Sequence, residues 1–176
     1  HSAELSTLQA IEISNRPIAI THANPLFWHS AIRNKSNAVL KALSETGGML
    51  GFSIYPHHLK NGSNCKMEEF CIMVAKTAEM IGVKNIGFGS DLCQSQNDNV
   101  VRWMRNGTWT FNEDYGEGSA ASPGFPEQPE WFQDNRDFPQ LLRGLFKVGF
   151  SEEEVKLIAA ENWINFFETS FSPVKN

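Results

Sequence analysis

The chain lacks several features that would assign it quickly to a class of protein. It has only three cysteines and no Cys-x-x-Cys pair, so neither a disulfide framework nor a thiolate zinc site is indicated. No apolar run approaches the ~20 residues of a membrane-spanning helix, and the start of the sequence does not resemble a signal peptide. Lys and Arg number 15 against 20 Asp and Glu, a net charge of −5, which argues against a nucleic-acid partner. The compartment stays open, with a cytoplasmic location favoured slightly over a secreted one.

What is present is the composition of an ordinary globular protein. The 176 residues are 41% hydrophobic and 20% charged, which is enough for one domain with a substantial core. This length is short of the ~250 residues typical of a closed eight-stranded α/β barrel.

Short apolar runs alternate with helical patterns through the first half of the chain. The expected elements cover residues 3–14 (helix), 18–22 (strand), 36–46 (helix), 49–54 (strand), 67–81 (helix) and 85–90 (strand). The strands begin at 18, 49 and 85, which are 31 and 36 residues apart, the pitch of successive βα units. We therefore expect an α/β fold with a parallel sheet and right-handed crossovers, in which the strand over 18–22 is buried.

Local signals indicate where several helices begin, end and pack. Leu5, Leu8 and Ile11 recur at roughly helical spacing, and with Ile13 they are expected to form the buried face of the first helix. Ser36 is the expected N-cap of the second helix, and Gly47-Gly48 is its expected end.

Beyond the third strand the regular pattern stops. Residues 94–136 are rich in Gly, Pro and Asn, with only a short helix indicated over 99–105. A loop of that length in a compact domain is usually a lid or a binding segment, and its many aromatic residues favour an ordered structure. Helices are expected again over 137–148, from the N-cap Ser151 to about residue 160, and over 161–169.

Polar side chains stand at the ends of the expected strands. His22 ends the first strand, Tyr55 and the pair His57-His58 follow the second, and Asp91 follows the third. The carboxyl ends of parallel strands meet at one edge of a sheet, so these side chains are expected to lie close together. Imidazoles near a carboxylate suit Zn²⁺, and a carboxylate that is not itself a ligand can take a proton from a metal-activated water.

Each of these residues also has a plainer interpretation. His22 would be a packing or capping residue, His1 a remnant of a histidine tag, Asp91 the cap of a turn, His57-His58 a solvated loop pair, and Arg33 a partner in a surface salt bridge.

Taken together, the motifs resemble a known family. His1, Pro17–His22, Arg33-Asn34, Gly48–Phe52 and Ile86–Asp91, in this order, resemble the carboxy-terminal half of the renal (membrane) dipeptidase family. Its members are zinc dipeptidases of the metal-dependent amidohydrolase type, built on a TIM-like (β/α)8 barrel. The resemblance covers nearly the whole chain, since Gly149–Glu154 and Ala160–Asn162 resemble the closing helices of the family.

The resemblance implies a role for each matching residue. His1 and His22 match the two histidines that bind the second of two Zn²⁺ ions. Arg33 matches the arginine that holds the terminal carboxylate of the substrate, a task that suits a bidentate guanidinium. Asp91 matches the aspartate that accepts and returns a proton, and Tyr55 falls near an aromatic position of the pocket. The implied reaction is hydrolysis of a dipeptide or a related small amide by metal-activated water.

The sequence also departs from the family pattern. The family usually reads Gly-Ser-Asp-Phe-Asp-Gly around its catalytic aspartate, whereas Gly89–Gln94 reads Gly-Ser-Asp-Leu-Cys-Gln and lacks the second Asp and the turn Gly. This departure affects the expected substrate range more than the reaction.

Several donors of the family site have no counterpart among these 176 residues: the His-x-Asp pair, the bridging Glu and the oxyanion-binding His. We therefore expect residues 1–176 to form the carboxy-terminal half of one barrel domain, with the amino-terminal part of the barrel as partner. Within this half we expect βα units over 1–93, an insert over 94–136 and closing helices over 137–170. A homodimer is compatible with this arrangement.

Two other functions stay open. The protein could be an amidohydrolase for a non-peptide amide or lactam, with residues 94–136 reshaping the pocket. It could also be a barrel half whose metal site has decayed and that keeps a structural or binding role. The retention of His1, His22, Arg33 and Asp91 favours the dipeptidase.

Overall fold

The computed structural model describes residues 1–94, 99 and 125–172. The helix expected over 99–105 and most of the expected insert over 94–136 lie outside the described residues. The main elements are α1 (Glu4–Ile13), β1 (Ala19–Ala23), α2 (Asn37–Glu45), β2 (Met49–Phe52), α3 (Met67–Ile81), β3 (Ile86–Phe88), α5 (Phe138–Lys147), α6 (Glu152–Lys156) and α7 (Asn162–Phe171).

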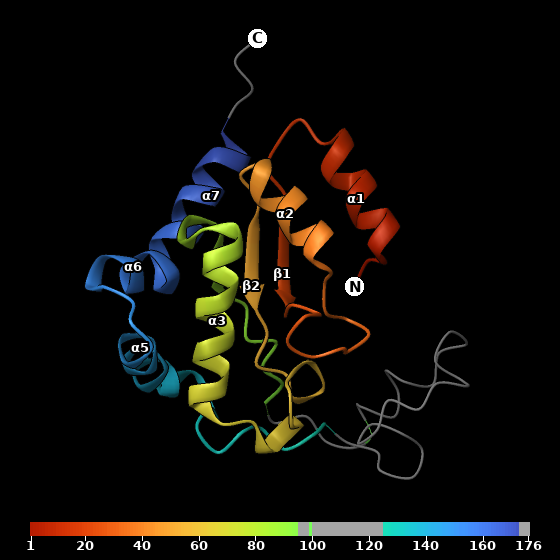
Figure 1. Ribbon diagram of the computed structural model, residues 1–176. Coiled ribbons are helices and arrows are strands. Elements are labelled where there is room, and N and C mark those ends of the chain that lie inside the picture. Colours follow the sequence, from red (N-terminus) through yellow and green to blue (C-terminus); the bar gives the residue numbers. More distant parts are fainter. Residues whose placement is uncertain (95–98, 100–124, 173–176) are drawn as a thin grey trace.

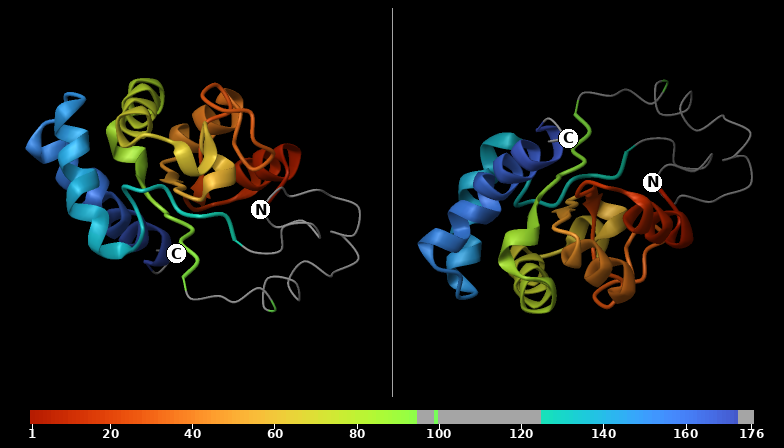
Figure 2. Two further views of the ribbon diagram at one scale, coloured as in Figure 1. Left: turned by 90° about the horizontal axis from the view of Figure 1, so that it is seen from below. Right: turned by 90° about the horizontal axis from the view of Figure 1, so that it is seen from above.

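The three strands form the expected parallel sheet, and their order in it is β1-β2-β3. The chain passes from β1 to β2 through α2 and from β2 to β3 through α3. In Figure 1, α2 and α3 lie in front of the strands. Helix α1 lies to the right, on the side of α2 away from α3. The end-on views of Figure 2 place α1 and the C-terminal helices on opposite flanks of the strands.

Large apolar side chains fill the space between the sheet and its covering helices. Phe70 of α3 meets Phe52 of β2 and Phe88 of β3 with ring centroids 6.3 and 6.5 Å apart. Leu50 and Ile86, on the same two strands, are fully buried. Burial of each such side chain stabilises the fold by about 1.5–3 kcal/mol, so this layer holds β2 and β3 in place.

Glycines keep the opposite side of β2 and β3 open to close packing. Trp163 of α7 donates its indole N–H to the carbonyl of Phe88, at 3.0 Å. A Cβ at Gly87 would lie only 2.6 Å from the indole nitrogen of Trp163, and one at Gly51 only 3.1 Å from its ring. Glycine at these positions thus permits the close approach of Trp163 to the two strands.

The expected burial of α1 and β1 was partly wrong. Leu5 and Ile13 are 68% and 78% exposed, and the buried residues of α1 are Thr7 and Ile11. In β1, Ile20 is only half-buried. The reason is topological, because β1 is an edge strand of the described sheet and α1 packs mainly against α2.

The helix ends follow the local signals, with one exception. Ser36 accepts a hydrogen bond from the backbone N–H of Val39, and Ser151 forms a capping box with Glu154. The expected break near residue 160 is absent: a π-helical segment, Leu157–Glu161, joins α6 to α7. Residues 152–171 contain neither Gly nor Pro, so nothing in them stops a helix. Among the described helices, none is both long and apolar enough to cross a membrane.

Candidate functional site

The first strand is bulged at the point where it delivers His22. The register with β2 shifts between Ile20 and Ala23, so that Thr21 and His22 together face Gly51. A bulge of this kind bends the strand and redirects its side chains, and bulges are common beside active sites.

The bulge depends on glycine in both other strands. A Cβ at Gly51 would lie 2.1 Å from the carbonyl oxygen of Thr21, and one at Gly89 would lie 1.6 Å from it. The Thr21 carbonyl therefore occupies the space that any side chain at those positions would fill. The course of β1 at the site is set by residues of β2 and of the segment after β3.

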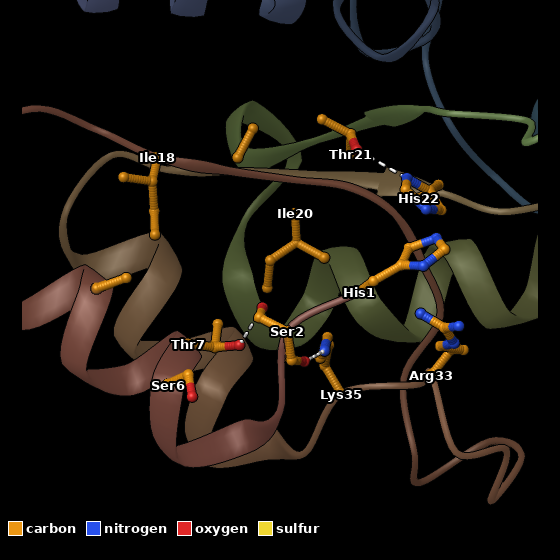
Figure 3. Close-up of a pocket in the computed structure, with 12 residues that line it drawn as sticks. His1, Ser2, Ser6, Thr7, Ile18, Ile20, Thr21, His22, Arg33 and Lys35 are labelled. Atoms are coloured by element: carbon orange, nitrogen blue, oxygen red, sulfur yellow. Dashed lines mark hydrogen bonds between the residues drawn. The ribbon is translucent and has the colours of Figure 1, made fainter. Parts of the chain in front are cut away.

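The structure brings His1 and His22 together. Their ring centroids are 5.0 Å apart and the rings meet edge to face at 60°, with the two side chains adjacent in Figure 3. Nδ1 of His22 shares a hydrogen bond of 2.8 Å with the Thr21 hydroxyl. Because Nδ1 is engaged, Nε2 is the nitrogen of His22 that stays available to a metal.

A cavity of about 140 Å³ lies beside the two histidines, between α1 and β1. Arg33 and Lys35 also line it, whereas no Asp or Glu does so among the described residues. Arg33 forms no hydrogen bond or ion pair within the described part of the chain, so the salt bridge considered for it is absent there. A cavity lined by cations suits an anionic group such as a carboxylate.

Lys35 plays a different part from Arg33. Its ammonium group donates to the carbonyl of Ser2 at 2.6 Å (Figure 3), and the residue is 8% exposed. Burial lowers the pKa of Lys35, Arg33 lowers it further, and Glu4 raises it. Lys35 thus ties the segment after His1 to the segment after Arg33.

Asp91 lies near this group of cations but does not line the cavity. It follows β3 in the left-handed region, with φ of 55°, and is half-buried. The Asp91 carboxylate lies within electrostatic range of the backbone nitrogen of His1, at the end of the sheet where the strands end.

The residues after β2 form a packed cluster. The ring centroid of Tyr55 lies 5.4 Å from that of His57 and 5.3 Å from that of His58. His58 is 5% exposed and shares a 2.8 Å hydrogen bond with the Ser53 hydroxyl, so a solvated loop pair is the wrong description for it. Tyr55 does not line the cavity beside His1.

The pKa of His58 is lowered to about 4, chiefly by burial and to a lesser degree by the neighbouring His22 and Arg33. His58 is therefore neutral near pH 7 and contributes no charge to the site.

Two imidazoles alone do not make a zinc site. Within the described residues, no group of three or more His, Cys, Asp or Glu side chains could hold a metal ion. Zinc takes four ligands in most protein sites, and imidazole nitrogen is among its preferred donors. His1 and His22 thus fit zinc as part of a donor set.

Comparison with known proteins identifies the family. A family model described as membrane dipeptidase (peptidase family M19) matches residues 1–101, more than half of the chain. The chain belongs to this family. M19 is a family of metallodipeptidases, and the expected resemblance is confirmed.

Individual relatives are distant. Dipeptidase ataJ of Aspergillus terreus is 23% identical over 164 residues, which are 92% of this chain and 33% of that protein. An amidohydrolase from Pseudomonas aeruginosa has a TM-score of 0.82 at 22% identity, over 94% of this chain and 49% of that one. A metallopeptidase from Rhodobacter sphaeroides was crystallised with a phosphinate mimic of the dipeptide L-Ala-D-Ala. Its TM-score is 0.74 at 18% identity, over 97% of this chain and 41% of that one.

The likeness to solved structures shows the fold. The chain has the parallel α/β architecture of part of an amidohydrolase-type TIM barrel, so the expected fold class is confirmed. It spans a third of the length of the Aspergillus dipeptidase and under half of each of the two crystallised proteins.

Two residues near the site were not singled out in the sequence. Asn24 and Lys35 lie in the loop between β1 and α2, where polar residues are common and rarely informative. Only their burial marks them, and burial depends on contacts with other segments of the folded chain.

Proposed function

We propose that this M19 chain supplies His1 and His22 to a binuclear zinc site that hydrolyses dipeptides. The observation that carries the proposal is the edge-to-face approach of the two imidazoles, 5.0 Å between centroids, at the carboxyl end of the sheet. Zn²⁺, when bound, would act as a Lewis acid that lowers the pKa of water. The other zinc ligands would come from polypeptide outside these 176 residues, and residues 1–176 would form one half of a single barrel domain.

Arg33 would bind the terminal carboxylate of the substrate. Its guanidinium lines the cavity beside His1 and His22 and has no partner among the described residues, so its fork of N–H donors is available. With Lys35 engaged by a backbone carbonyl, Arg33 is the cation of this cavity suited to a ligand.

Asp91 would accept a proton from the attacking water and return it to the leaving amine. Its position after β3, within electrostatic range of His1, supports this role. Tyr55, which packs on His57 and His58, would form part of the pocket wall on the β2 side.

Dipeptides are the substrate class that the family supports best. The Rhodobacter metallopeptidase was crystallised with a dipeptide mimic, and we extend that ligand class to this chain by proposal. An amidohydrolase of other small amides would use the same residues, whereas a purely structural barrel half would use none of them.

The test measures zinc content and dipeptide hydrolysis in the complete protein that contains these residues. We expect His22→Ala to lower bound zinc from about two towards one per chain and to abolish most turnover. His29→Ala, which removes an imidazole outside the cavity, is the matched control and should leave both unchanged. If His22→Ala retained the zinc content of the control, His22 would not be a ligand.

A further inference from the structure

The loop that carries Arg33 is closed at its base. Pro25 and Lys35 form an isolated parallel β-bridge, and the backbone N–H of Leu26 donates to the carbonyl of Lys35 at 2.8 Å. The N–H of Lys35 in turn donates to the carbonyl of Asn24 at 2.9 Å. Arg33 lies two residues before the closing position, so the base of the loop fixes its backbone.

Asn34, directly after Arg33, is the buried side chain of this base. Its amide nitrogen donates to the carbonyls of His29 and His58 at 2.9 and 3.1 Å. Its amide oxygen accepts from the backbone N–H of Asn24 at 3.0 Å. Three hydrogen bonds from one side chain, 5% exposed, link the Arg33 loop to the end of β1 and to the segment after β2.

Asn24 extends the same network towards β2. Its side chain is fully buried, donates to the carbonyls of Ser53 and His58, and accepts from the N–H of Ser53. The two asparagine amides therefore converge on the carbonyl of His58. Buried and fully bonded amides of this kind specify one arrangement, because any other would leave polar groups unsatisfied.

We propose that Asn34 is the positioning residue for Arg33 and thereby a determinant of selectivity for substrates with a free carboxylate. The inference rests on the proposed function of Arg33. The guanidinium of Arg33 has no partner among the described residues, so the placement of its backbone decides where it reaches. Asn34 controls that backbone from the adjacent position, through contacts that leave the cavity itself untouched.

The chain offers a matched control for this role. Asn162 of α7 is also buried, and its amide nitrogen also donates to two backbone carbonyls, those of Val83 and Ile86, each at 2.8 Å. The carbonyl of Ile86 lies at the start of β3 and that of Val83 in the turn just before it, at the end of the sheet away from Arg33. Replacing either asparagine by alanine removes two side-chain donations from the protein interior. Asn34→Ala removes in addition the hydrogen bond that the Asn34 amide oxygen accepts from Asn24.

The experiment compares Asn34→Ala and Asn162→Ala in the complete protein. KM and kcat are measured for one dipeptide with a free and with an amidated carboxyl terminus, together with the melting temperature. We expect both variants to have a lower melting temperature than the wild type. Only Asn34→Ala should reduce the preference for the free carboxylate over the amide, by roughly 10- to 100-fold. The loss should lie mainly in KM for the free dipeptide, with the amidated substrate little affected.

Two results would overturn the proposal. If Asn34→Ala kept the wild-type preference while melting as early as Asn162→Ala, Asn34 would have a structural role only. If Asn34→Ala failed to fold, Asn34→Asp, which keeps the size and the acceptor oxygen but loses both donations, would be judged by the same criterion. A wild-type enzyme that treated free and amidated dipeptides alike would instead overturn the role of Arg33.

Discussion

The hydroxyl oxygen of Thr21 lies 2.8 Å from Nδ1 of His22, within the bulge that ends β1. A partner on the far nitrogen of a metal-binding imidazole fixes its tautomer and orientation, and loss of such partners typically costs 10- to 100-fold in metal affinity. Thr21 thus connects the backbone geometry of the bulge to the ring that is proposed to bind zinc.

The first prediction follows from this contact. Thr21→Val keeps the shape of the side chain but removes the hydroxyl, so zinc affinity should fall about 10- to 100-fold, as measured by competition with a chelator. Thr46→Val is the control, because the Thr46 hydroxyl bonds the carbonyl of Leu43 at the other end of the sheet. Equal affinities in the two variants would mean that Thr21 does not orient a ligand.

Arg33→Lys should weaken the binding of free dipeptides. Lysine keeps the positive charge but loses the fork of donors, so binding should weaken by about 1–3 kcal/mol, read as a rise in KM. Amidated dipeptides should be poor substrates already and should lose little more. Arg136 forms an exposed ion pair with Asp134, so Arg136→Lys is the control. It should change KM neither for free nor for amidated dipeptides. Equal losses on both substrate types would show that Arg33 does not meet the carboxylate.

Asp91→Asn separates an enzyme from a structural barrel half. Asparagine keeps the size of the side chain but cannot accept a proton at neutral pH, so kcat should fall about 10²- to 10⁴-fold. Fold and zinc content should stay near normal, as judged by circular dichroism and elemental analysis. Glu152→Gln, which removes an exposed ion pair with Lys156, should leave kcat unchanged. An Asp91→Asn variant as fast as wild type would exclude the proton-transfer role.

The buried imidazole of His58 predicts a loss of stability in acid. Its pKa is about 4 in the folded protein and about 6.5 when unfolded, so only the unfolded chain takes up the proton between these values. The contribution of His58 to the free energy of unfolding should therefore be complete above pH 6.5. It should be lost, by up to about 3 kcal/mol, as the pH drops to 4.

Urea unfolding of wild type and His58→Gln between pH 4 and 7 measures this contribution. Glutamine cannot titrate but can still bond the Ser53 hydroxyl, so the difference between the two curves should shrink with falling pH. Parallel curves would mean that His58 is not the titrating group.

The local sequence by itself determined the order of the helices and strands in the first half of the chain and the caps of several helices. The 31- and 36-residue pitch of the strands reflects βα units, and the caps at Ser36 and Ser151 depend on side chains that bond backbone within three residues. Such interactions need no distant partner, so they can be read from a short stretch of sequence. The order of the motifs likewise indicated the M19 family.

The details of the site were decided by tertiary structure. No residue near Thr21 in the sequence predicts a bulge. The space for the Thr21 carbonyl is provided by Gly51 and Gly89, which are 30 and 68 positions away. The burial of His58 and of Asn24 depends in the same way on segments that meet only when the sheet has formed. Leu5 is exposed because it lies on a face of α1 that does not pack against α2. Local pattern encodes local hydrogen bonds and periodicity, whereas burial and strand register depend on contacts that exist only in the folded chain.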